Sequence, residues 1–183
     1  KGGVTEIEDA DRLNVDGKGF YRVLYENFEN EVRRCRSSFD RWNLLSDAYA
    51  GLLSFSLDFG SYLKFAESFK EEKSYLPAIT ILSQLTSLNA ISKGKMESIY
   101  REYLSSLYEA WKDRNDYKAK MFMGVLLRRL AQQDAAKAKE LASQDFFKTD
   151  PNYRGAVAVA KAVVSSAPYD ELLSIYSRAA DDE

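Results

Sequence analysis

The chain has 183 residues, of which 45% are hydrophobic, 13% aromatic and 30% charged, so it has enough apolar material for one packed domain and is not intrinsically disordered. Its 26 basic and 28 acidic residues give a net charge of −2, so no overall positive charge favours nucleic acid and none is expected as a partner, although a local basic face stays open. It has one cysteine, Cys35, and no histidine, which removes the usual general base, the Ser-His and Cys-His nucleophile pairs and most zinc sites.

Residues 1–19 predict a flexible acidic leader. This segment lacks helical periodicity, and its acidic side chains begin at Glu6. Its last part, Asp16-Gly17-Lys18-Gly19, has the composition of a turn. We therefore expect the first helix to begin after this turn.

The stretch from Tyr21 to Lys73 predicts one long helix. Its apolar residues recur at steps of three or four from Phe28 to Phe69, and it has no proline. A helix of this length would span roughly 80 Å, so its apolar stripe would need partner helices along its whole length. Gly51 and Gly60 leave an alternative, in which a break near either glycine gives two ordinary helices.

The remaining residues predict further helices and no sheet. Ser74 is a candidate N-cap with Pro77 in the first turn, and the three-four spacing returns between Met96 and Leu130. Thr149-Asp150-Pro151 and Ser165-Ser166-Ala167-Pro168 are start signals for two short helices. Alternation with a period of two is missing.

We therefore predict an all-α fold with three parts. Residues 20–148 are expected to form an elongated antiparallel bundle of long helices. Residues 149–183 are expected to form a pair of short helices packed on that bundle, and residues 1–19 are the leader. No apolar run approaches the ~20 residues of a transmembrane helix.

No residue pattern predicts catalysis. Glycine-rich phosphate loops are missing, and neighbouring carboxylates such as Glu71 and Glu72 point in different directions on a helix. We predict a protein that is not an enzyme, with no catalytic residue, no cofactor, no metal and no small-molecule substrate. Cys35 lies on the apolar stripe and is expected to act as a small buried hydrophobe, although flanking arginines leave a reactive thiol as the alternative.

Two groups of side chains are candidate contact sites. The first group is basic and would attract anionic lipid or an acidic partner, although an ordinary solvated surface is the simpler interpretation. It consists of Arg33, Arg34, Arg36, Arg128 and Arg129. The second group is aromatic, follows the stripe of the long helix and predicts a helix–helix interface. It consists of Phe39, Trp42, Tyr49, Phe55, Phe59 and Tyr62.

About residues 20–120 resemble the BAR region of sorting nexins. The resemblance is carried by the run Ser46–Phe69, by Leu82–Leu88, and by Glu102-Tyr103-Leu104 with Trp111, Arg114 and Lys118 after it. It implies a homodimer or heterodimer that binds curved anionic membrane, with Arg33, Arg34 and Arg36 as candidate contacts. Pro151 and Pro168 depart from this family, because they interrupt the chain where a long third helix is expected.

The sequence thus predicts a non-catalytic scaffold or protein-interaction module that resembles a coiled coil. Its partner would be a second copy or another protein, bound through the long helix. The alternative is a BAR-like module that binds anionic membrane surfaces in trafficking. A single cysteine cannot form an intramolecular disulfide, so we expect a cytoplasmic location, with the periphery of membranes as the alternative.

Overall fold

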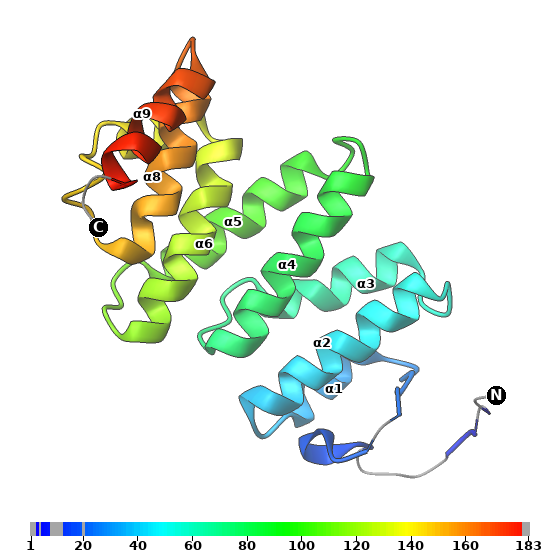
Figure 1. The fold of residues 1–183 in the computed structure, drawn as a ribbon. Coiled ribbons are helices and arrows are strands. Elements are labelled where there is room, and N and C mark those ends of the chain that lie inside the picture. Colours follow the sequence, from blue (N-terminus) through cyan, green and yellow to red (C-terminus); the bar gives the residue numbers. More distant parts are fainter. Residues whose placement is uncertain (1–2, 4, 8–12, 20, 181–183) are drawn as a thin grey trace. The chain divides into compact units, whose positions relative to one another are not determined.

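In the computed structural model, the described residues are 3, 5–7, 13–19 and 21–180, and they form helices, turns and loops without any strand (Figure 1). The predicted all-α class is therefore confirmed for this part of the chain. None of the described helices combines the length and the apolar character needed to cross a bilayer. The predicted cytoplasmic location stays a prediction.

The chain divides into two compact units, Lys1–Phe69 and Lys70–Glu183, and each is described here by itself. The predicted domain boundaries after residues 19 and 148 stay a prediction, as does the elongated antiparallel arrangement.

The first unit contains short helices instead of one long helix. Its elements are a 3-10 turn η1 (Val15–Gly17), α1 (Phe28–Arg34), α2 (Ser38–Leu53), α3 (Phe59–Ala66) and a 3-10 turn η2 (Glu67–Phe69). The predicted continuous helix over residues 21–73 is therefore wrong. The alternative of a break near Gly51 or Gly60 is closer, because the chain leaves the helix between these two glycines.

Local capping explains the break between α1 and α2 and the break between α2 and α3. After α1, Ser37 accepts a hydrogen bond from the backbone N–H of Asp40 (3.0 Å), and the Asp40 carboxylate accepts one from the Ser37 N–H (3.3 Å). This capping box starts a new helix. After α2, Phe55 has a φ of 59°, in the left-handed region, and Asp58 then caps α3 by accepting from the Ser61 N–H (3.0 Å).

A polar stripe on α2 holds the chain segment that precedes α1. Asp40, Asn43 and Asp47 are spaced by three and four residues and are all buried. Asp40 accepts a hydrogen bond from the backbone N–H of Asp16 (3.1 Å), and Asp47 accepts one from the Arg22 guanidinium (3.2 Å). The end of the predicted leader is thus bound to α2.

The predicted turn before the first helix is confirmed by η1, in which the Gly17 N–H donates to the Asn14 carbonyl (2.9 Å). Most of the predicted acidic leader, including residues 8–12, lies outside the described residues.

The buried carboxyl group of Asp47 is expected to make the stability of the protein depend on pH. Its side chain is 1% exposed, and burial raises its pKa despite the hydrogen bond from Arg22. A carboxyl group with a raised folded-state pKa favours folding at low pH, and this contribution is lost as the pH rises through that pKa. We therefore expect Asp47→Asn to become more stable relative to wild type between pH ~3.5 and pH 7, as measured by urea unfolding.

Asp58→Asn is the matched control, because its pKa is shifted in the opposite direction. Hydrogen bonds from Ser61 lower the pKa of Asp58, so its carboxylate favours folding above pH ~4 and loses this effect as the pH falls. Asp58→Asn should therefore lose stability relative to wild type over the same rise in pH. Parallel pH slopes for the two variants would contradict this assignment.

The second unit is a stack of helices in two layers (Figure 1). Its helices are α4 (Tyr75–Ile91), α5 (Glu97–Trp111), α6 (Tyr117–Gln133), α7 (Ala135–Ala142), α8 (Pro151–Val164) and α9 (Pro168–Ala180). α6 packs against both α4 and α8, while α5 packs on α4 and α6, and α7 and α9 pack on α8. Stacked helix pairs of this kind are typical of α-solenoids.

The helices of this unit are shorter than predicted, since α4 and α6, the longest described, have 17 residues each. The long helices expected over residues 20–148 are therefore not present in the described part of the chain. The two short C-terminal helices are present and begin at Pro151 and Pro168, as their start signals indicate.

Trp111, the last residue of α5, belongs to the buried core of the second unit. Its side chain is fully buried, and the indole N–H donates a hydrogen bond to the Glu72 carbonyl (2.6 Å). The ring packs against Phe122 with 4.5 Å between ring centroids, and the Arg114 guanidinium lies 4.1 Å from the ring centroid. This residue joins the segment before α4 to α5 and α6.

α6 and α8 approach each other closely at Gly124. Gly124 of α6 faces the backbone carbonyl of Asn152, and a side chain at this position would collide with that oxygen. Beside it, the Asp150 carboxylate accepts the Asn152 N–H (3.0 Å) and pairs with Lys120 of α6 (3.0 Å). These hydrogen bonds lower the pKa of Asp150 to about 2.

Candidate functional site

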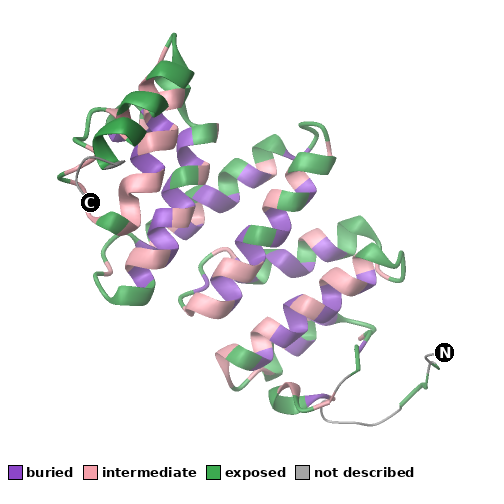
Figure 2. Cartoon of the chain, viewed as in Figure 1, coloured by how far each residue is buried: buried purple, intermediate pink, exposed green. Residues whose placement is uncertain are grey.

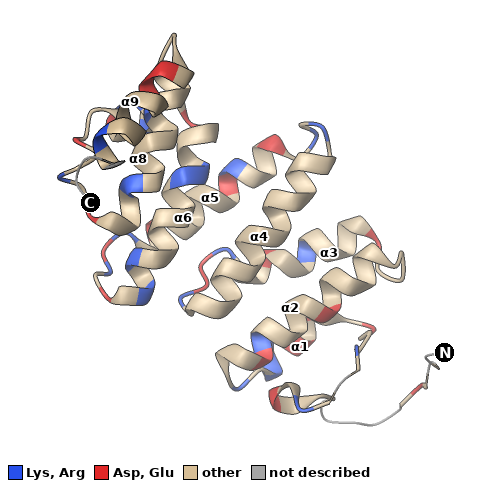
Figure 3. Ribbon diagram, in the orientation of Figure 1, with Lys and Arg blue, Asp and Glu red and all other residues tan. Residues whose placement is uncertain are grey.

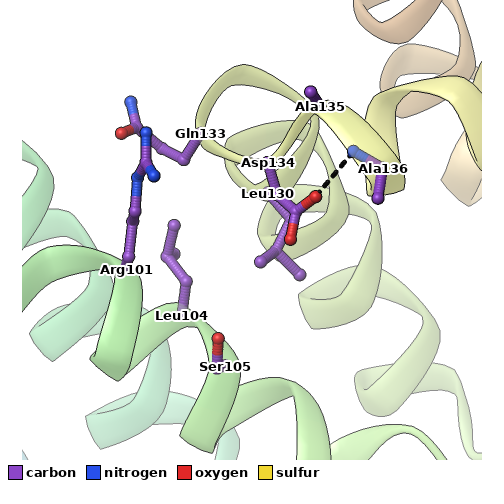
Figure 4. A pocket seen from close by; sticks show the side chains of 8 residues that line it. All are labelled: Arg101, Leu104, Ser105, Leu130, Gln133, Asp134, Ala135 and Ala136. Carbon is purple, nitrogen blue, oxygen red and sulfur yellow. Dashed lines mark hydrogen bonds between the residues drawn. The ribbon is translucent and has the colours of Figure 1, made fainter. Parts of the chain in front are cut away.

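A cavity of about 370 Å³ lies where α5 approaches the junction of α6 and α7 (Figure 4). The residues that line it come from three helices. They are Arg101, Leu104 and Ser105 of α5, Leu130 and Gln133 of α6, and Asp134, Ala135 and Ala136 at the start of α7.

The break between α6 and α7 shapes this cavity. Asp134 has an extended backbone (φ −131°, ψ 111°), which ends α6 and redirects the chain. Its carboxylate accepts hydrogen bonds from the N–H groups of Ala136 (2.8 Å) and Lys137 (3.0 Å), the first of which is drawn in Figure 4. The carboxylate of Asp134 therefore serves as the cap of α7.

The cavity combines an apolar floor with a polar edge. Leu104 and Leu130 are buried, whereas the Arg101 side chain is 55% exposed and pairs with Glu97 one turn earlier. Gln133 lines the cavity from α6 with its side-chain amide. A guanidinium and an amide above an apolar floor suit a carboxylate or a carbonyl group.

A second hollow, of about 650 Å³, lies along α5. Its lining residues are Glu71, Lys73, Ser105, Ser106, Glu109, Ala110 and Asp113, so Ser105 borders both hollows. We call the side chains of Arg101, Ser105, Ser106 and Glu109 of α5, together with Asp113 in the turn that follows it, the α5 surface. Arg101, paired with Glu97, lies at one end, and Glu109 and Asp113 lie at the other, where Lys73 also lines the hollow.

The α5 surface offers no obvious catalytic centre. Within the described residues, no three Cys, Asp or Glu side chains gather closely enough to hold a metal ion. Acidic and basic side chains are interspersed over the described helices (Figure 3). The arrangement is therefore suited to contact with a polar ligand.

The five arginines predicted as contacts belong to different units. Arg33 and Arg34 end α1, Arg36 lies in the following linker, and all three are exposed. Arg128 and Arg129 lie on α6 in the second unit, where Arg128 is exposed and its guanidinium lies close to Gly155 of α8. Whether any of them contacts a ligand stays a prediction.

The six aromatic residues predicted as one interface do not share one helix. Phe39, Trp42 and Tyr49 lie on α2, Phe55 lies in the turn, and Phe59 and Tyr62 lie on α3. Tyr62 is fully buried, whereas Phe55 is 95% exposed. They form no continuous stripe because the helix is interrupted, and their role as an interface stays a prediction.

Cys35 is half-buried at the end of α1, and its thiol donates a hydrogen bond to the Glu31 carbonyl (3.4 Å). The cavity of Figure 4 was not predicted from the sequence, although Asp134 followed by two alanines is an N-cap signal that would have placed the α6–α7 junction.

Comparisons with known proteins identify relatives of this chain. Residues 12–183 match the model of a family described as ERAP1-like C-terminal domain. The chain is 34% identical to Tricorn protease-interacting factor F2 of Thermoplasma acidophilum over 98% of its own length, which is 24% of that protein. It is 30% identical to leucyl aminopeptidase of Saccharolobus solfataricus, over 94% of the chain and 22% of that protein. It therefore spans about a quarter of the length of these curated relatives.

These relatives contradict three predictions. The resemblance to BAR regions is wrong, because three-four apolar spacing is common to packed helices of any family. The scaffold function and its membrane-binding alternative are overturned because the matched relatives are linked by name to aminopeptidases and proteases. For the same reason, a homodimer through the long helix and a membrane surface are no longer supported as partners. The chain belongs to the family of ERAP1-like C-terminal domains.

Proposed function

We propose that this chain serves as the C-terminal helical domain of an aminopeptidase. The observation that carries this proposal is the match of residues 12–183 to a C-terminal domain family. The leucyl aminopeptidase relative is more than four times as long as the matched segment, since the chain covers 22% of it. The chemical step would belong to the remaining part of the longer protein.

A direct assay of two proteins tests this role. The longer protein that contains this chain is expected to release 4-nitroaniline from one or more aminoacyl-4-nitroanilides. Residues 1–183 alone are expected to release none. Failure of the longer protein on a full panel of amino acids, or hydrolysis by residues 1–183, would contradict the proposal.

Within this role, we assign the α5 surface to contact with the peptide. Peptides carry backbone carbonyls and a terminal carboxylate, which match the donors of Arg101 and Gln133. They also carry N–H groups and basic side chains, which match the carboxylates of Glu109 and Asp113 at the other end. The two hollows that share Ser105 support one elongated ligand.

The same assay separates this contact from catalysis. Arg101→Ala in the longer protein is expected to raise KM for peptides of several residues roughly tenfold, because a charge-assisted hydrogen bond is lost. Its kcat, and its KM for short anilides, should stay unchanged. Arg33→Ala, which removes an exposed arginine from the first unit, is the matched control. An unchanged peptide KM in Arg101→Ala would remove the α5 surface from the proposal.

A further inference from the structure

The outer face of α9 is apolar and exposed. Tyr169, Leu172, Leu173 and Tyr176 follow three-four spacing, and their exposed fractions are 75%, 42%, 47% and 71%. No side chain described on α9 is buried, and Figure 2 shows the helix mostly in the colour of exposed residues. A helix in contact with water on this face would normally carry charged residues there.

The inner face of α9 is the more polar one. Glu171 pairs with Lys161 of α8 (3.9 Å), and the Arg178 guanidinium lies 4.3 Å from the ring centroid of Phe147. Ile175 is half-buried. α9 therefore turns polar side chains toward the rest of the unit and apolar ones outward, the reverse of an ordinary surface helix.

The end of α8 also exposes apolar side chains. Val163 and Val164 precede the turn into α9 and are 50% and 46% exposed. Along the described stack, α4 and α8 lie on opposite sides of α6, so α8 and α9 form one of its ends. The last pair in a stack of helices usually has a polar outer face, which keeps the protein in solution. This pair lacks that feature.

We infer that the outer face of α9 packs against an amphipathic helix of the same longer polypeptide, from a part outside residues 1–183. The inference rests on the proposed function, because it needs that longer protein. About three quarters of the length of the factor F2 relative lies outside the matched segment, which is ample chain for such a helix. The expected partner carries leucine or aromatic residues at three-four spacing, complementary to Leu172, Leu173 and Tyr176.

Cysteine labelling in the longer protein tests this contact. Leu173→Cys and Tyr176→Cys are compared with Tyr117→Cys and Ile91→Cys, whose parent side chains are 72% and 69% exposed. Maleimide modification, mapped by peptide mass spectrometry, should be about tenfold or more slower at the two α9 sites. All four sites should react equally in denaturant.

Equal native rates at the four sites would overturn the inference. Slow labelling at α9 that becomes fast on dilution to the monomer would also overturn it, because a second copy would then be the occupant. Hydrogen exchange of wild-type residues 168–180 guards against variants that perturb the fold, and fast exchange there would count against the contact. Neither readout depends on activity, so an inactive protein with a protected α9 would refute only the proposed function.

Discussion

Trp111→Ala is expected to lower the free energy of unfolding by about 3 to 5 kcal/mol. The side chain is fully buried, so its loss leaves a cavity between α5 and α6. It also leaves the Glu72 carbonyl without the indole donor, 2.6 Å away in the native protein. Urea unfolding followed by far-ultraviolet circular dichroism measures the loss.

Two variants identify the cause of this loss. Trp111→Phe keeps most of the volume but removes the hydrogen bond, so its expected cost is about 1 to 2 kcal/mol. Trp42→Ala removes the other tryptophan, which is only half-buried on α2 and should cost less than Trp111→Ala. A Trp111→Ala variant as stable as Trp42→Ala would contradict the burial of Trp111 in the core.

The helical class of this protein could be predicted from side-chain spacing, but the helix ends could not. The three-four spacing runs through Val32, Cys35 and Phe39, although Cys35 has an extended backbone (φ −65°, ψ 122°) and the helix is interrupted there. The spacing of the apolar residues shows which face of a helix is apolar. Whether the helix continues is decided by local capping residues, which can end one helix and start another. Ser37, with Asp40 three residues later, is the local signal in the sequence that a new helix starts here.

The polar stripe of α2 could also be predicted in part from the sequence. Asp40, Asn43 and Asp47 share the spacing of the apolar residues, and buried polar groups need partners. Those partners, such as Arg22, lie in a segment that the sequence analysis assigned to the beginning of a long helix. Their contact depends on the tertiary fold.

The cavity at α5 could not be predicted from the sequence, because it too depends on the tertiary fold. Arg101 and Gln133 belong to different helices, and neither lies in a recognisable motif. They meet because α5 packs on α6 and because Asp134 ends α6 directly after Gln133. Only the second of these facts has a local signal, the cap formed by Asp134.

Gly124→Ala and Gly155→Ala are expected to have opposite effects, although both replace a glycine within a helix. In an unobstructed helix, this substitution stabilises by about 1 kcal/mol. At Gly155 the added methyl group would meet only the Arg128 guanidinium, the mobile end of a long side chain, so we expect a stability between unchanged and about 1 kcal/mol higher.

At Gly124 the added methyl group would meet the backbone carbonyl of Asn152, which cannot move without moving α8. We expect Gly124→Ala to destabilise by about 1 to 3 kcal/mol, because it forces α6 and α8 apart. Urea unfolding of both variants measures the difference, and equal stabilities would contradict the close α6–α8 contact. Since α9 packs on α8, a displacement of α8 would also displace α9 and its apolar outer face.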